Sequence, residues 1–307
     1  MLTFVLRRIG YSLIVVVGVL VIVFVTTRLV GDPARIILPA TATQEDYEIQ
    51  RSRMGLDQPV LAQFAEFVAG AARGDFGNSL WDREAPAMSL VVERVPATLQ
   101  LVFGGVGLAL LVSIPAGILA ARRPRSLLDR VITILSLAGF SIPNFLVAMG
   151  LIIVFAVGLG WFYTSGFGTV RHLVLPAVAV ALPIAGRMTQ FVRSAMIDEF
   201  SRPYVATARS KGVSEPRIAT RHALRNASIP ILTLGGWEFT RQMAGYTVAV
   251  EVVFAWPGVG QLAAQAILRR DFTVIAADVF LVAIIVVFIN LIIDLLYMIL
   301  DPRVKVG

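Results

Sequence analysis

The chain has 307 residues, of which 57% are hydrophobic and 15% charged, and this balance excludes an ordinary soluble domain and indicates an integral membrane protein. Because cysteine is absent, disulfides, thiolate metal sites and thiol nucleophiles are excluded too. The net charge of +7 does not predict a nucleic-acid partner, because the arginines stand beside apolar runs, as they do on the cytoplasmic loops of membrane proteins.

The first apolar run, Ile9–Thr27, carries no charge and is long enough to cross a hydrocarbon core of about 30 Å. Arg7 and Arg8 precede it. A cleavable signal peptide begins in the same way, but Arg28-Leu-Val-Gly-Asp-Pro follows here in place of a small-residue cleavage site. We therefore expect residues 1–30 to form an uncleaved N-terminal transmembrane helix.

Residues 31–95 form a mixed polar segment. Between Asp32 and Arg94 there are ten acidic and six basic residues, so the segment is net acidic. It is either a solvated loop or an external cap that touches another protein. An amphipathic helix, lying on the membrane or folded onto the domain, is predicted by apolar residues at helical spacing: Val60, Leu61, Phe64, Phe67, Val68 and Ala71.

Three more spans follow in order. Val95–Ala121 is the second, and His172 to about Met196 is the fourth. The charge-free run between them, Val131–Val170, is longer than one span requires. Glycine and aromatic residues gather from Gly158 onward, so we expect the third span to end there and an external loop to follow.

A charged segment, residues 197–228, stands between the fourth and fifth spans. Ser201 is expected to cap a short helix, and Gly212 can end that helix in the left-handed conformation. Ser214 is expected to cap a second helix, with Pro216 in its first turn. The apolar face predicted for the second helix consists of Ile218, Ala219, His222 and Ala223. A short helix, a glycine turn and a basic amphipathic helix suit the binding of a soluble partner.

The fifth span, Ile229–Phe254, contains two charges, Glu238 and Arg241. They stand about nine and twelve residues from its start, which is near mid-membrane. Charges there cost at least ~2.5 kcal/mol each, so they are expected to face a cavity or each other. Their spacing of three allows them to pair on one helix face.

The sixth span, about Ile275–Leu300, carries Asn290 and Asp294 four residues apart on one face. Hydrogen bonding to neighbouring helices is favoured over ion conduction for this pair. In the fourth span, Arg187 and Arg193 are placed to snorkel toward the cytoplasmic side.

Basic residues set the expected orientation. Both ends of the chain and the two loops around residues 122–130 and 202–225 are rich in arginine and lysine, whereas residues 31–94 are net acidic. The positive-inside rule therefore places both termini in the cytoplasm, and an even number of spans agrees with this. The charged segment 197–228 is then cytoplasmic.

That segment resembles the coupling loop of binding-protein-dependent ABC importer permeases, whose pattern is Glu-Ala-Ala, three residues, Gly, nine residues, then Ile-x-Leu-Pro. Gly212 takes the glycine place, Ala206-Thr207-Ala208 that of Glu-Ala-Ala, and His222-Ala223-Leu224-Arg225 that of Ile-x-Leu-Pro. The acidic first residue and the final proline are replaced here by Ala206 and Arg225.

More of the chain is similar to one branch of that family, the B-type subunits of dipeptide, oligopeptide and nickel importers. The form Tyr-Val-x-Thr-Ala-Arg-x-Lys-Gly, from Tyr204 onward, is typical of this branch. The external segment adds Gly31-Asp-Pro-Ala, Gly55-Leu-Asp-Gln-Pro and Arg73-Gly-Asp-Phe-Gly-Asn-Ser, and Val248–Gly260 is similar to Val-Glu-x-Val-Phe-x-Trp-Pro-Gly-x-Gly. Trp256 in this last motif is expected at the membrane interface, in a turn that either joins two spans or touches substrate.

The resemblance implies an all-α membrane protein with the type I ABC importer permease fold. It implies six transmembrane helices with cytoplasmic termini, and three parts: a helix in 1–30, an external segment in 31–95, and a core permease domain in 96–307. It also implies a multi-pass protein of the bacterial inner membrane. The partners would be a second homologous permease, two cytosolic ATPases that hold ATP and Mg, and an extracytoplasmic solute-binding protein.

Two sets of site residues follow from this. Contact with the ATPases is implied for Tyr204, Ala206, Thr207, Ala208, Arg209, Lys211, Gly212, Val213 and Pro216. We further hypothesise that the charges in the fifth span and their neighbours shape the translocation path: Trp237, Glu238, Arg241, Gln242 and Tyr246. A self-neutralised pair buried between helices is an equal alternative for Glu238 and Arg241.

No catalytic site is expected in this chain. It lacks Gly-x-x-x-x-Gly-Lys-Ser/Thr and the hydrolase motifs, so ATP hydrolysis requires another chain. His172 and His222 have no metal-ligand spacing, and no metal or cofactor is expected. The alternative function is an ion-driven secondary transporter or channel, with Glu238, Asp278 and Asp294 as relay groups. The cargo stays open among peptides, glutathione, nickel chelates, opines, haem and sugars.

Overall fold

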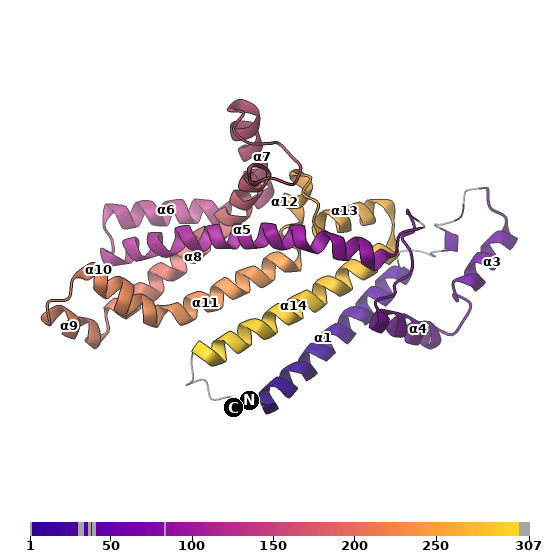
Figure 1. Cartoon of the computed structure of the whole chain (residues 1–307), viewed down its shortest axis with the longest axis horizontal. Helices are drawn as coiled ribbons and strands as arrows, with labels where there is room; N and C mark the ends of the chain where they lie inside the picture. Colours follow the sequence, from indigo (N-terminus) through magenta and orange to yellow (C-terminus); the bar gives the residue numbers. More distant parts are fainter. Residues whose placement is uncertain (1, 30–33, 36–37, 39–40, 83, 301–307) are drawn as a thin grey trace. The chain divides into compact units, whose positions relative to one another are not determined.

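The computed structural model describes residues 2–29, 34–35, 38, 41–82 and 84–300, and its regular elements are helices (Figure 1). Most of the Gly31-Asp-Pro-Ala motif lies outside the described residues. So does the tail from Asp301, which includes the C-terminus that is predicted to be cytoplasmic. The chain divides into two compact units, residues 1–96 with 258–288, and residues 97–257 with 289–307.

Two long helices, α5 (Ala87–Arg122) and α14 (Phe272–Leu300), contribute to both units. The other helices of the first unit are α1 (Leu2–Leu29), α3 (Gln44–Arg53), α4 (Val60–Arg73) and α13 (Val259–Arg269). The second unit adds α6 (Leu127–Ser141), α7 (Asn144–Leu151), α8 (Val170–Phe200), α9 (Pro203–Ser210), α10 (Glu215–Arg217), α11 (Leu224–Arg241) and α12 (Val248–Val253). It also has three π-helical stretches, η1 (Ile152–Gly158), η2 (Ile218–Ala223) and η3 (Gln242–Tyr246).

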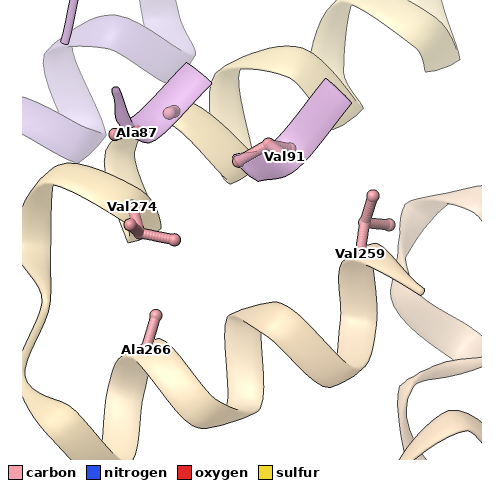
Figure 2. Packing of buried hydrophobic residues seen from close by; sticks show 6 residues of the cluster. Ala87, Val91, Val259, Ala266 and Val274 are labelled. Carbon is pink, nitrogen blue, oxygen red and sulfur yellow. The ribbon is translucent and has the colours of Figure 1, made fainter. Parts of the chain in front are cut away.

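The core of the first unit is made of small apolar side chains, which let helices approach closely. Ala87 and Val91 of α5 lie toward Val259 and Ala266 of α13 and Val274 of α14 (Figure 2). A hydrogen-bonded corner beside this core fastens a loop to the start of α14. There, Ser79 Oγ donates to Asp271 Oδ2 at 2.5 Å, and the Trp81 backbone N–H donates to the same oxygen at 3.3 Å.

Helix α4 confirms the amphipathic helix predicted from the apolar residues between Val60 and Ala71, and it folds onto α1. Its Phe64 and Phe67 rings lie 5.2 Å and 5.7 Å from the ring of Phe24. It ends at Gly74, whose φ of 73° suits glycine. Leu61 at the other end of the predicted apolar face is 83% exposed, so only part of that face is covered.

In the second unit, α6, α8 and α11 pack together, and α9 and α10 lie at the opposite end from α7 and α12 (Figure 1). Glycine allows the close approach of α6 and α8, because a Cβ at Gly186 would lie 3.0 Å from the backbone N of Phe140. The same two helices are joined by a bidentate ion pair: Arg193 Nε and Nη2 donate to Asp129 at 2.5 and 2.8 Å. Asp129 also accepts from the Arg125 backbone N–H at 2.7 Å.

The third predicted span is broken, which corrects the expectation of one continuous helix. Helices α6 and α7 meet at an angle of 100° across a break at Ile142 and Pro143. Proline disfavours the helical conformation of the residue before it, and Ile142 is accordingly extended, with ψ of 127°. The prediction that the helical stretch ends near Gly158 is confirmed, because η1 ends there.

The fifth predicted span is also interrupted. Helix α11 passes into η3, where Gly245 has φ of 111°, before α12 begins at Val248. By length and composition, four helices in the described part of the chain could cross a membrane: Gly10–Leu29, Ala87–Arg122, Val170–Phe200 and Phe272–Leu296. The bent pair of α6 and α7 with η1 raises this to five, so the predicted count of six is not confirmed.

Candidate functional site: a coupling segment and a charged cluster

Residues 197–228, which are predicted to couple to ATPases and are called the coupling segment below, contain α9, which begins at Pro203. Proline suits this first turn because the first helical N–H groups have no partner inside the helix. The predicted serine cap is wrong: Arg202 takes the cap position, and Ser201 Oγ instead donates to the Asp198 carbonyl at the end of α8. Ser201 therefore stands one residue before the N-cap of α9.

Gly212 ends the turn after α9 as predicted, with φ of 74°. Its N–H donates to the Arg209 carbonyl at 2.9 Å, and the Val213 N–H donates to the Ala208 carbonyl at 3.1 Å. These two bonds are the 5→2 and 6→1 bonds of a Schellman motif, which satisfies the last carbonyls of the helix. The glycine therefore fixes the direction in which the chain leaves α9.

The second helix of the segment starts at Ser214, the predicted position, though no side-chain hydrogen bond caps it. It runs without a gap through α10 and η2 into α11. Its predicted apolar face is confirmed, since Ile218, Ala219 and Ala223 are buried and His222 is half-buried. Val205 of α9 is also buried, and α9 packs on η2.

Polar contacts hold the two short helices in place. Arg209 Nε and Nη2 donate to the Glu215 carboxylate at 2.7 and 3.3 Å, and this hydrogen bonding lowers the pKa of Glu215. Tyr204 Oη donates to Glu199 Oε2, on the last turn of α8, at 2.6 Å. Burial, together with this bond, raises the pKa of Tyr204, so the tyrosine stays a protonated donor at neutral pH.

Most of the predicted ATPase-contact residues are accessible. Tyr204, Ala208 and Val213 are half-buried. The exposed ones are Ala206, Thr207, Arg209, Lys211, Gly212 and Pro216. These accessible residues belong to helices that are anchored by buried apolar side chains, among them Val205 and Ile218.

The charged cluster consists of Arg187 on α8, Glu238 and Arg241 on α11, and Tyr246 on η3. Arg187 Nε and Nη2 donate to Glu238 Oε1 and Oε2 at 2.8 and 2.9 Å. Arg241 Nη1 lies 3.6 Å from Glu238 Oε1, so the predicted i,i+3 pair exists but is the weaker contact. The guanidinium of Arg241 also stacks 4.3 Å from the centre of the Tyr246 ring.

Sequence reasoning missed Arg187 as a member of this cluster. It assigned Arg187 and Arg193 to snorkelling, whereas each binds a carboxylate on a neighbouring helix, Glu238 and Asp129 respectively. A signal was available: an arginine that has 17 helical residues before it and 13 after it in α8 is far from either end. Such a residue requires a partner more than a route to the interface.

The other predicted path residues fall into two groups. Trp237 and Tyr246 are exposed large aromatic residues beside the charges, and Gln242 is buried. Gln242 thus does not share the accessible surface of the cluster. Asn144, at the start of α7, donates from Nδ2 to the Tyr246 carbonyl at 2.9 Å and steadies the interrupted stretch η3.

Helix α11 has two chemically different sides. At 100° per residue, Glu238 lies between the two sides, and Trp237 and Arg241 point roughly opposite to Gly235 and Phe239. The latter two line an apolar groove of about 450 Å³ together with residues of α5 and α14, among them Leu110 and Ile293. The predicted packing role of Asn290 on α14 is confirmed, since Thr240 Oγ1 donates to Asn290 Oδ1 at 3.1 Å.

A second buried carboxylate, Glu251 on α12, is satisfied by neutral groups. It accepts from Thr98 Oγ1 at 2.8 Å and from Thr247 Oγ1 at 3.1 Å. Near it, Trp256 is fully buried and donates from Nε1 to the Ala97 carbonyl at 2.8 Å. The ring is thus packed inside the protein beside α5, and its position at the membrane interface stays a prediction.

No group of three or more His, Cys, Asp or Glu residues in the described ranges is arranged to hold a metal ion. His172 instead stacks on Tyr163, with ring centres 4.2 Å apart, and hydrogen-bonds Thr169 Oγ1 at 2.8 Å. It serves to order the loop before α8.

Two family models match the chain. Residues 113–306 match the binding-protein-dependent transport system inner membrane component, and residues 1–102 match the N-terminal part of the membrane component of such systems. The oligopeptide transport system permease AppB of Bacillus subtilis is 37% identical, over 99% of this chain and all of that protein. The glutathione transport system permease GsiC of Escherichia coli K12 is also 37% identical, over 99% of both chains.

Among solved structures, a chain of the inward-facing MetNI methionine ABC transporter superposes with a TM-score of 0.59 at 21% identity. The match covers 70% of this chain and 97% of that one. This likeness shows a shared all-helical fold. Taken with the two family models, it shows that the chain belongs to the inner membrane components of binding-protein-dependent ABC transport systems, as a multi-pass permease similar to those for oligopeptides and glutathione.

Proposed function

We propose that this chain is one permease subunit of an ATP-driven importer for short peptides. It forms half of the translocation path with a second, homologous permease, and a solute-binding protein delivers the cargo from outside. The support is the family and the two relatives, one named for oligopeptides and one for glutathione, itself a tripeptide. ATP and Mg are held by two separate cytosolic ATPases.

In this proposal both termini and the coupling segment 197–228 are cytosolic, six helices cross the membrane, and residues 31–95 form an external segment that meets the binding protein. The N-terminal helix in 1–30 and the core domain in 96–307 complete the subunit. The basic loops beside the apolar helices support this orientation.

The observation that carries the proposal is the way the exposed face of α9 is fastened to α8 and α11. Val205 is buried, Tyr204 is bonded to Glu199 of α8, and the Schellman turn at Gly212 sets the path into η2 and α11. Movement of a bound ATPase would therefore displace both helices as one lever. The same two helices carry Arg187 and Glu238, so the push would reach the charged cluster directly.

The free energy for this cycle comes from ATP. A ligand shifts two conformations only by its unequal affinity for them. Closure of the ATPase pair around ATP favours the outward-facing state, in which the binding protein releases cargo. Hydrolysis then restores the inward-facing state.

The test is to place a bulky acid in the fastened helix. We expect Ala208→Glu to abolish co-purification of the ATPases and ATP-dependent uptake in proteoliposomes, because it adds bulk and a negative charge to a half-buried residue of the proposed contact surface. The matched control is Ala65→Glu on the exposed side of α4, which should keep the ATPases attached. Attached ATPases with Ala208→Glu, or uptake by the intact complex that follows an ion gradient and needs no ATP, would refute the proposal.

A further inference from the structure

The charged cluster carries one more positive than negative charge. Arg187 and Arg241 both contact the Glu238 carboxylate, at 2.8 and 3.6 Å. Within the described part of the chain, neither arginine contacts a second carboxylate. Two guanidinium groups always carry their charge, so one charge of the cluster lacks a counter-ion among the described residues.

The positive groups of the cluster are also the accessible ones. Glu238 is 1% exposed, and Arg187 occupies both of its oxygens. The side chains of Arg187 and Arg241 retain 30% and 26% of their exposure. A molecule that approaches the cluster therefore meets guanidinium edges, with the carboxylate hidden behind them.

Arg241 keeps hydrogen-bonding capacity for a further acceptor. A guanidinium has five N–H donors in a planar fork. Arg241 makes one 3.6 Å ion contact and lays its face on Tyr246, an arrangement that leaves its edge available. Arg187, by contrast, uses two of its donors, Nε and Nη2, in hydrogen bonds to Glu238. Arg241 is thus held in position by one carboxylate and one ring, while its remaining donors have no partner in the part of the chain that the structure describes.

The cluster lies near the middle of a membrane-spanning helix, where a surplus positive charge is costly unless an anion binds to it. Arg187 lies 17 residues from the start and 13 from the end of α8, which is about 26 Å and about 20 Å along the helix. An unmatched charge near mid-membrane is retained where it faces water or a charged ligand. A planar carboxylate, the anion that every free peptide carries at its C-terminus, fits a guanidinium fork.

Building on the proposed function, we propose that Arg241 is a binding station for the C-terminal carboxylate of the passing peptide, supported by Arg187 and Glu238. Trp237 stands one helical turn before Arg241 and Tyr246 lies against it, so exposed aromatic rings flank the carboxylate position. The importer then selects for a free carboxylate inside the membrane, independently of what its binding protein selects outside.

The experiment compares trialanine with its C-terminal amide in proteoliposomes that contain the complete importer. Both peptides are offered at concentrations that saturate the binding protein equally, measured beforehand by titration. The wild-type importer is expected to transport the free acid about tenfold faster than the amide, which is the range of one charge-assisted hydrogen bond. Arg241→Gln is expected to bring the ratio to about one by slowing the acid alone.

Two further variants keep the result interpretable. Arg241→Lys retains the charge and should keep most of the preference, and Arg171→Gln removes a charge from an exposed arginine at the start of α8 and should leave the wild-type ratio intact. Equal rates for acid and amide in the wild type, or an unchanged ratio in Arg241→Gln, would overturn the inference while ATP-dependent uptake still upholds the proposed function. If the wild-type complex shows no ATP-dependent uptake of either peptide, both fall.

Discussion

The charged cluster and the coupling segment each contain a bidentate arginine–carboxylate pair, and the two pairs differ in their surroundings. Arg187 and Glu238 meet at 2.8 and 2.9 Å with the carboxylate 1% exposed. Arg209 and Glu215 meet at 2.7 and 3.3 Å with side chains that are 48% and 47% exposed. The chemistry is the same, but water replaces the lost partner in only one of them.

Because the two pairs differ in exposure, they contribute differently to the stability of their regions. A buried pair that loses one partner leaves a charge with little solvent around it, whereas an exposed pair contributes little to stability. The coupling segment must therefore obtain its rigidity from other features, namely the buried Val205 and Ile218 and the turn at Gly212. The charged cluster, in turn, depends on charge for its geometry.

The largest effect on stability is expected for Glu238→Gln, in the charged cluster. It leaves Arg187 and Arg241 facing each other without a counter-charge, and we expect the free energy of unfolding in detergent to fall by about 3 kcal/mol. The estimate is at the low end for a buried pair because both arginines can still reach some water. A loss below about 1 kcal/mol in chemical denaturation would mean that the cluster is hydrated and not buried.

Sequence reasoning located the coupling segment well, because its signals are local. The proline of α9, the left-handed Gly212 and the apolar face of Ile218, Ala219 and Ala223 lie within about 20 residues and are fixed by backbone geometry. The i,i+3 contact of Glu238 and Arg241 was predictable for the same reason.

The features that could not be predicted from the sequence depend on contacts between residues far apart in the chain. The pairing of Arg187 with Glu238 joins positions 51 apart, and the bond from Trp256 to Ala97 joins positions 159 apart. No local pattern encodes which helix face meets which. The break at Pro143 was different, because Ile142-Pro143 carries a readable signal that the uninterrupted hydropathy of the run concealed.

An intermediate effect is expected when the rigidity of the coupling segment is tested at Gly212. Gly212→Ala places a Cβ on a residue with φ of 74°, which costs about 1 kcal/mol of local stability and loosens α9. We expect lower amide protection for residues 203–212 in hydrogen exchange, together with weaker ATPase stimulation by cargo.

The matched control is Gly150→Ala in α7, where the backbone is helical and the site of a new Cβ is empty. This variant should be as stable as the wild type or slightly more stable, since alanine is a better helix former than glycine. Equal behaviour of the two alanine variants would show that the turn at Gly212 does not hold α9.

The smallest effect is expected for Glu215→Gln, the same substitution as in the buried pair, at about 0.5 kcal/mol or less. The hydrogen bond from Arg209 lowers the pKa of Glu215, so the pair stabilises the folded chain above the unfolded pKa of about 4.3 and loses this contribution as pH falls through the lower folded value. Wild type and variant should thus differ slightly at pH 7, differ less in high salt, and converge in the acid range. A loss here as large as that of Glu238→Gln would mean that the exposed pair, and not the Schellman turn with its apolar anchors, fixes the coupling segment, and the contrast between the two regions would no longer hold.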